Sequence, residues 1–256
     1  MASSITDTDL HGALSLYAGL VGRILAHPDR WLGTDDDPPP QAHPLRRTLA
    51  AVRNRTLGHI TPASARWHRL PVTVRTRWWV SRIGASAGLA AAAPRFAGAL
   101  ADRIPLQAAL GVSAAGLAVC AVAREHGRTQ PTDWVPLLAQ VLFDRHLDTG
   151  AVPIADPAQA EHELETAAAD PTEPPSTMDK LGLGAQRTVR TLWRLARTFL
   201  DLDDLLDLRP RGGILARGLA KIPVIGVAGG WLDERGAIRT AAHRTQKLLT
   251  PTAPHP

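Results

Sequence analysis

The stretch IPLQAALGVSAAGLAVCAVA, residues 104–123, contains no charged residue and decides the fold of this chain. Alanine and leucine dominate it, and both residues favour the α-helix. A helix of this length spans about 30 Å, which is also the thickness of the hydrocarbon core of a bilayer. Pro105, Gln107 and Ser113 interrupt its apolar character, and alanine gains little from transfer into lipid. We therefore interpret the stretch as a buried core helix, with a membrane-inserted or hairpin segment as the alternative.

The composition extends this helical interpretation to the whole chain of 256 residues. The chain has 42 alanines and 34 leucines but only 14 valines and 10 isoleucines, so strong helix formers greatly outnumber β-branched residues. Cys120 is the single cysteine, which excludes an intramolecular disulfide and a four-cysteine zinc site. The sequence predicts an all-α protein, a single bundle of about seven to nine helices whose alanine- and glycine-rich centre comes from residues 83–123 and 222–232.

Periodic apolar residues and proline-rich breaks predict the organisation along the chain. Residues 1–44 are expected to hold an amphipathic helix that ends at His27-Pro28, followed by a connection rich in proline and aspartate. Residues 45–250 form the expected helical domain, with an acidic insertion at 151–180, and residues 251–256 form a disordered tail. The helices of this domain are expected at about 45–57, from 71 into the alanine-rich run, at 104–123 with Gly127 as C-cap, at 132–148, at 186–208, and finally up to about 249.

Charge is segregated along the chain, although the formal net charge is only +5. Residues 45–82 contain nine arginines and no acid, whereas residues 151–180 contain seven acids and one base. The first residues, MASSITDTDL, lack the basic start and apolar run of a secretory signal. The sequence therefore predicts a cytoplasmic protein with a strongly basic segment near its most apolar helix.

The basic segment combines arginines with tryptophans, a pairing that suits the boundary between water and lipid headgroups. A solvated basic helix face with tryptophans in the core is the alternative interpretation. Nucleic acid would be attracted by the same charge, but no helix-turn-helix, zinc-finger or RNA-binding signature accompanies it. The candidate membrane- or anion-binding residues are Arg66, Trp67, Arg69, Arg75, Arg77, Trp78, Trp79 and Arg82.

An aspartate-rich motif offers an enzymatic alternative. Asp203, Asp204 and Asp207 form a DDxxD pattern, which in all-α isoprenoid synthases places carboxylates one helical turn apart to hold magnesium ions and a diphosphate. The second metal motif of those enzymes is missing, and nearby arginines predict a salt-bridged helix end instead. Apart from this alternative, which implies Mg²⁺ and a prenyl diphosphate, the sequence predicts no catalytic residues and no cofactor.

Two segments together resemble the EcsC family of bacterial proteins. The first runs from Leu100 through Ile104-Pro105 into the uncharged helix that ends at Gly127. The second contains Ile222-Pro223-Val-Ile-Gly226 and is followed by a basic helix with alanines at 237, 241 and 242. The chain departs from the family pattern at His126, where the family usually has tyrosine, and in the acidic insertion.

The resemblance implies an α-helical, membrane-associated protein for which the family supplies no established catalytic residues. Together with the basic segment, it predicts a non-enzymatic factor that docks peripherally on the inner face of the cell membrane. The expected partners are an anionic lipid surface and, further, a membrane protein complex, whereas nucleic acid is not favoured. The sequence leaves the oligomeric state open.

Overall fold

The computed structural model describes residues 6–32, 60–92, 104–147, 190–196 and 230–250, and all regular secondary structure in them is helical. This confirms the prediction of an all-α protein. Outside the described residues lie the helix expected at 45–57, most of the helix expected at 186–208, most of the apolar segment 222–232, the acidic segment 151–180 and the tail. The elements in chain order are α1 (Asp7–Ala26), α2 (Pro28–Leu32), the 3₁₀ helix η1 (Trp67–Arg69), α4 (Val72–Ala92), α5 (Ile104–Glu125), α6 (Pro131–Phe143) and α10 (Gly230–Leu249).

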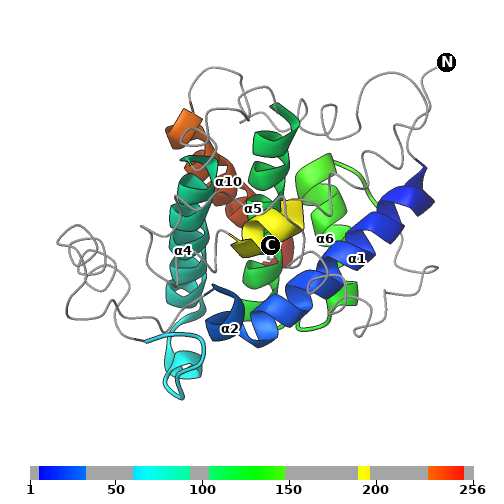
Figure 1. Cartoon of the computed structure of the whole chain (residues 1–256). Coiled ribbons are helices and arrows are strands. Elements are labelled where there is room, and N and C mark those ends of the chain that lie inside the picture. The colour runs from blue at the N-terminus through cyan, green and yellow to red at the C-terminus, as the bar shows by residue number, and fades with distance from the viewer. Residues whose placement is uncertain (1–5, 33–59, 93–103, 148–189, 197–229, 251–256) are drawn as a thin grey trace, which may run out of the picture.

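Helix α5 is the centre of the structure, with α4, α6 and α10 packed around it and α1 lying against α6 (Figure 1). Every residue from 112 to 123 is buried. The uncharged stretch therefore forms a core helix, as its interruptions by polar residues predicted. Among the helices that the structure describes, none is both long and apolar enough to cross a membrane.

The end of α5 follows from its sequence. Gly127 has a φ of 89°, in the left-handed region that costs glycine little, and its N–H donates to the carbonyl of Arg124 at 3.0 Å. The N–H of Arg128 donates to the carbonyl of Ala123 at 3.0 Å. These two bonds form a Schellman motif, which satisfies the last carbonyls of the helix. The predicted C-cap role of Gly127 is confirmed.

The helix ends differ from the prediction at two places. The connection expected from Pro28 onward begins with the short helix α2, because Pro28 suits the first turn of a helix and Trp31 and Leu32 are buried. Helix α6, expected to reach residue 148, ends at Phe143 because Asp144 adopts a left-handed φ of 55°. Asp can adopt this conformation more readily than most residues, and it terminates the helix.

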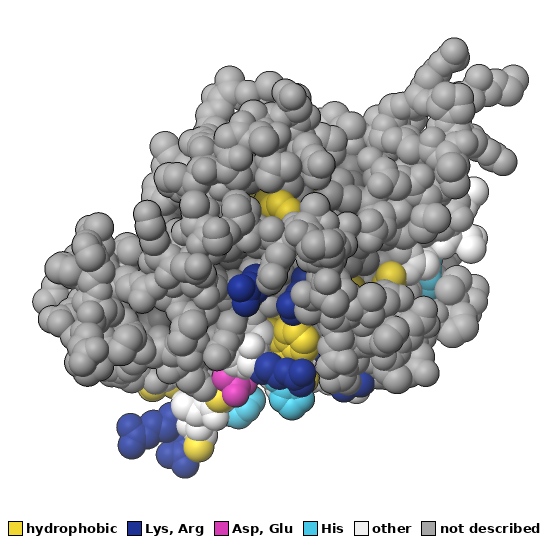
Figure 2. All heavy atoms as spheres, in the orientation of Figure 1, with side chains coloured by type: hydrophobic (Ala, Val, Ile, Leu, Met, Phe, Trp, Pro, Cys, Tyr) yellow, Lys and Arg dark blue, Asp and Glu magenta, His cyan; other side chains and the backbone are white. Residues whose placement is uncertain are grey.

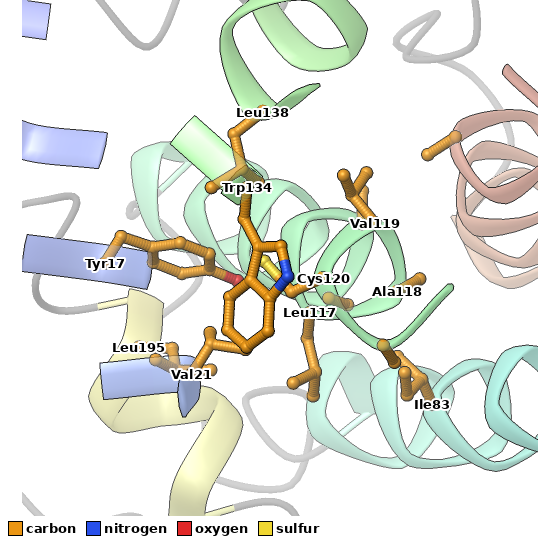
Figure 3. Packing of buried hydrophobic residues seen from close by; sticks show 14 of the residues in the cluster. Tyr17, Val21, Ile83, Leu117, Ala118, Val119, Cys120, Trp134, Leu138 and Leu195 are labelled. Carbon is orange, nitrogen blue, oxygen red and sulfur yellow. The ribbon is translucent and has the colours of Figure 1, made fainter. Parts of the chain in front are cut away.

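The close packing of α1 against α5 depends on Tyr17, which is fully buried (Figure 3). Its hydroxyl group donates a hydrogen bond to the backbone carbonyl of Ser113 at 2.6 Å. The ring lies against Gly116, where an added Cβ atom would sit only 2.7 Å from the hydroxyl oxygen. Trp134 of α6 and Cys120 of α5 complete the surroundings in this part of the core.

We expect the stability of the fold to fall at alkaline pH because of Tyr17 and Cys120. Burial raises the pKa of both side chains well above their ordinary values, and Cys120 raises the pKa of Tyr17 further. The folded state therefore keeps both protons after the unfolded chain has released them. The free energy of unfolding should decrease above about pH 9 because of Cys120, by about 1.4 kcal/mol per pH unit, and above about pH 10 by a similar further amount because of Tyr17, until the raised pKa values are reached.

The single tyrosine of the chain makes this expectation directly measurable. Absorbance near the tyrosinate band, recorded while the pH is raised, should show no ionisation of Tyr17 until the far-UV circular dichroism reports unfolding. Ionisation with the ordinary pKa of an exposed tyrosine, while the helical signal persists, would contradict the buried position of Tyr17. Replacing Cys120 by alanine should shift the onset of alkaline destabilisation to higher pH.

Candidate functional site

A single carboxylate at the end of α5 joins two segments that are far apart in the sequence. The side chain of Glu125 is only 6% exposed, and its Oε2 atom lies 2.5 Å from a guanidinium nitrogen of Arg75 in the first turn of α4. Its Oε1 atom accepts hydrogen bonds from the indole N–H groups of Trp67 at 3.1 Å and Trp79 at 2.9 Å. Charge-assisted hydrogen bonds of this kind offset the cost of burying a carboxylate. Glu125 therefore fixes η1 and the beginning of α4 to the end of α5.

The three tryptophans of the candidate site are buried, with side chains 2%, 6% and 1% exposed for Trp67, Trp78 and Trp79. Their rings meet edge to face, with centroids 5.0 to 6.4 Å apart. Such pairs stabilise a core beyond the area that they bury. The structure corrects the expectation of indole rings on the surface: these rings pack inside the protein, as in the alternative interpretation with core tryptophans.

The five arginines of the candidate site separate into two groups. Arg75 is held by Glu125, and Arg82 is only 8% exposed and donates to the backbone carbonyl of Leu32 at 3.3 Å. Both therefore have structural contacts. Arg66, Arg69 and Arg77 are exposed, and they are the part of the candidate set that an anionic partner can reach.

The exposed arginines belong to one end of the bundle, at which several helix termini meet. Arg75 and Glu125 join the start of α4 to the end of α5. Arg124 donates to the backbone carbonyl of Leu25, which joins the end of α5 to the end of α1. The indole N–H of Trp134, near the start of α6, donates to the carbonyl of Arg128 at 2.6 Å. These bonds hold termini of α1, α4, α5 and α6 at the same end of the bundle. Helix α2 lies there as well, because it follows α1 directly.

This end of the bundle is strongly basic. Asp29 is the one exposed acid in the described segments 27–32, 60–82 and 124–130. In the space-filling view, basic and histidine side chains gather along the lower edge, where α2 and the segment before α4 lie in Figure 1 (Figure 2). We call this surface the basic end and define it by seven exposed residues: His27, Arg30, Arg66, His68, Arg69, Arg77 and Arg128.

Arg124 contributes charge beneath this surface. Burial lowers the pKa of Arg124, and the adjacent Glu125 carboxylate opposes that shift. A guanidinium group remains protonated at neutral pH even when its pKa falls moderately. The basic end is therefore cationic at its surface and immediately below it.

The aspartates of the enzymatic alternative, Asp203, Asp204 and Asp207, lie outside the described residues. Within the part of the chain that the structure describes, no group of three or more histidine, cysteine, aspartate or glutamate side chains is placed to hold a metal ion.

Sequence reasoning missed several residues of the basic end because they come from other elements. His27 and Arg30 lie next to a proline-rich stretch that was expected to be a connection, and Arg128 follows the core helix. Glu125 is not among the predicted site residues. The sequence does contain a signal for its ion pair: Glu125 and Asp102 are the only two acids between residues 45 and 132, a span in which arginines are in excess. A lone acid beside a basic segment is a natural candidate for a buried ion pair.

Comparisons with known proteins add no relative: no family model, no curated protein and no solved structure matches the chain. The resemblance to the EcsC family therefore stays a prediction from the quoted motifs.

Proposed function

We propose that this chain is an EcsC-like helical factor that docks peripherally on an anionic lipid surface through its basic end. The observation that carries the proposal is the clustering of five exposed arginines and two exposed histidines from the residue after α1, from α2, from the segment before α4, from α4 itself and from the turn after α5. Asp29 is the single exposed acid among them in the described segments 27–32, 60–82 and 124–130. A bacterial inner membrane presents anionic headgroups on its cytoplasmic face, so the proposal places the protein there. The activity is binding, with no catalytic step assigned.

The physical basis of the proposal is electrostatic. Each basic side chain near an anionic bilayer contributes about 1 kcal/mol of binding free energy, and this contribution decays within a Debye length. The indole rings of Trp67, Trp78 and Trp79 are buried in the protein, so they pack beneath the basic end and do not enter the lipid. Docking of this kind needs no insertion of a helix and should be reversed by salt.

Vesicle flotation tests the proposal directly. Wild-type protein should float with vesicles that contain phosphatidylglycerol, should not float with pure phosphatidylcholine vesicles, and should be released at about 1 M salt, where the Debye length falls to about 3 Å. The triple variant R66Q/R69Q/R77Q should lose about 3 kcal/mol of binding free energy, which is roughly a 100-fold weaker association.

A matched control removes the same charge elsewhere. The variant R239Q/R244Q/K247Q lowers the net charge by the same amount on α10, outside the residues that define the basic end, and should retain most of the vesicle binding. Equal loss of binding in the two variants would show that vesicle binding depends on the net charge and not on the basic end, which contradicts the proposal. Failure of the wild-type protein to float with anionic vesicles at low salt would overturn the proposal.

A further inference from the structure

Helix α10 carries a second cationic surface that the basic end does not include. Arg239, His243 and Lys247 are exposed and follow one another at intervals of four residues, which places them on one face of the helix about 6 Å apart. Arg244 is exposed beside them. Residues 236–250 contain no acid. We call these four side chains the α10 row.

The opposite face of α10 is already used in the core. Ile238, Ala241 and Ala242 are buried, and the helix packs against α5 and α4. The apolar face is therefore not free to enter a bilayer, as it would be in an interfacial amphipathic helix. The α10 row stands on the remaining face. Leu248, whose side chain is 43% exposed, lies one turn after Arg244, at the border between the α10 row and the buried face. A partner that fits this face is acidic and carries an apolar side chain.

The acidic segment 151–180 of the same chain has this chemistry. It holds seven acids and one base, and Glu161, Glu163 and Glu165 alternate with His162 and Leu164. Its covalent attachment also favours it over an external partner. The chain leaves the described structure at Leu147, just after α6, and α6 packs against α10. The 14 residues from Leu147 to Glu161 reach up to about 45 Å when extended, whereas α10 is about 30 Å long.

We propose that the acidic segment 151–180 binds the α10 row within the same molecule. Tethering gives the segment an effective concentration in the millimolar range, so several ordinary ion pairs suffice to populate the contact. The contact neutralises the α10 row and leaves the basic end as the cationic surface of the protein. This inference rests on α10 and on the charge of the segment, and it holds or fails independently of lipid docking.

Carbodiimide cross-linking of the full chain, read by peptide mass spectrometry, tests the contact. The reagent joins a carboxylate to a lysine amine, and the chain contains only three lysines, Lys180, Lys221 and Lys247. We expect an isopeptide bond between Lys247 and one of the three glutamates at 161, 163 and 165. The yield of this cross-link should not change when the protein is diluted before the reaction, and it should fall when the reaction is run in salt that screens the charges.

Charge reversal supplies the specificity test. The variant R239E/R244E should lower the yield of the Lys247 to Glu163 cross-link at least tenfold, and adding E161R/E165R should restore it. The control R66E/R69E changes the same charge at the basic end and should leave the cross-link intact. A variant K247R should keep the charge but lose the cross-link, which verifies the site.

Three outcomes would overturn the inference. Lys247 could join only carboxylates outside 151–180, or none at all at low salt. Cross-links could form between isotopically labelled and unlabelled chains, which would assign the α10 row to a second copy. Finally, R239E/R244E could abolish flotation with phosphatidylglycerol vesicles as fully as the triple variant of the basic end, which would assign the α10 row to lipid.

Discussion

Replacing Glu125 by glutamine is expected to lower the free energy of unfolding by about 3 to 5 kcal/mol, the range typical of breaking a buried ion pair by removal of one partner. The glutamine side chain keeps one acceptor oxygen but places an NH₂ group against donors. At least one of Arg75, Trp67 and Trp79 then loses its acceptor while still buried or half-buried. Urea denaturation followed by circular dichroism measures the difference.

An exposed ion pair provides the control for this experiment. Asp7 lies 2.6 Å from Arg145, but the two side chains are 64% and 39% exposed. The variant D7N makes the same chemical change and should cost less than about 1 kcal/mol, because solvent screens the pair. Similar losses for E125Q and D7N would mean that the Glu125 contacts do not stabilise the basic end. If E125Q is too unstable to purify, W67F removes only one of the three donors and should show a smaller loss in the same assay.

The positions of the main helices could be predicted because they depend on local pattern. Apolar residues at three- and four-residue spacing predicted α1, α4 and α10, and the uncharged stretch predicted α5 with its glycine cap. The residues at which the helices begin and end could be predicted less well from the sequence. Helix α2 depends on burial of Trp31 and Leu32 by other elements, and that burial cannot be inferred from a proline-rich stretch.

The candidate site was predicted in part. Residues 75, 78, 79 and 82 share one face of α4, as the intervals of three and four residues require, and this face turns toward α5. The helical spacing therefore separates Trp78 and Trp79, which are buried, from Arg77, which is exposed. Treating the arginines and tryptophans as one surface overlooked this separation. The contribution of α1, α2 and the turn after α5 depends on tertiary packing, which one sequence does not reveal.

Opposite effects are expected from replacing two glycines of α5 by alanine. At Gly116 the new Cβ atom would lie 2.7 Å from the hydroxyl oxygen of Tyr17 and 2.9 Å from its ring carbons. Tyr17 is fully buried and bonded to the carbonyl of Ser113, so neither partner can move without loss. We expect G116A to destabilise the protein by about 2 kcal/mol or more, since overpacking outweighs the gain in helix propensity.

At Gly111 an added Cβ atom meets nothing within 4 Å. The variant G111A should therefore stabilise the protein by about 0.5 to 1 kcal/mol, the ordinary gain from alanine over glycine inside a helix. Because the two substitutions are chemically identical and lie in one helix, propensity cannot explain a difference in sign. Thermal unfolding of both variants measures it, and stabilisation by G116A would show that α1 does not approach α5 as closely as Tyr17 indicates. The double variant Y17F/G116A tests the contact further, since loss of the hydroxyl group removes the shortest clash and should recover part of the stability lost in G116A.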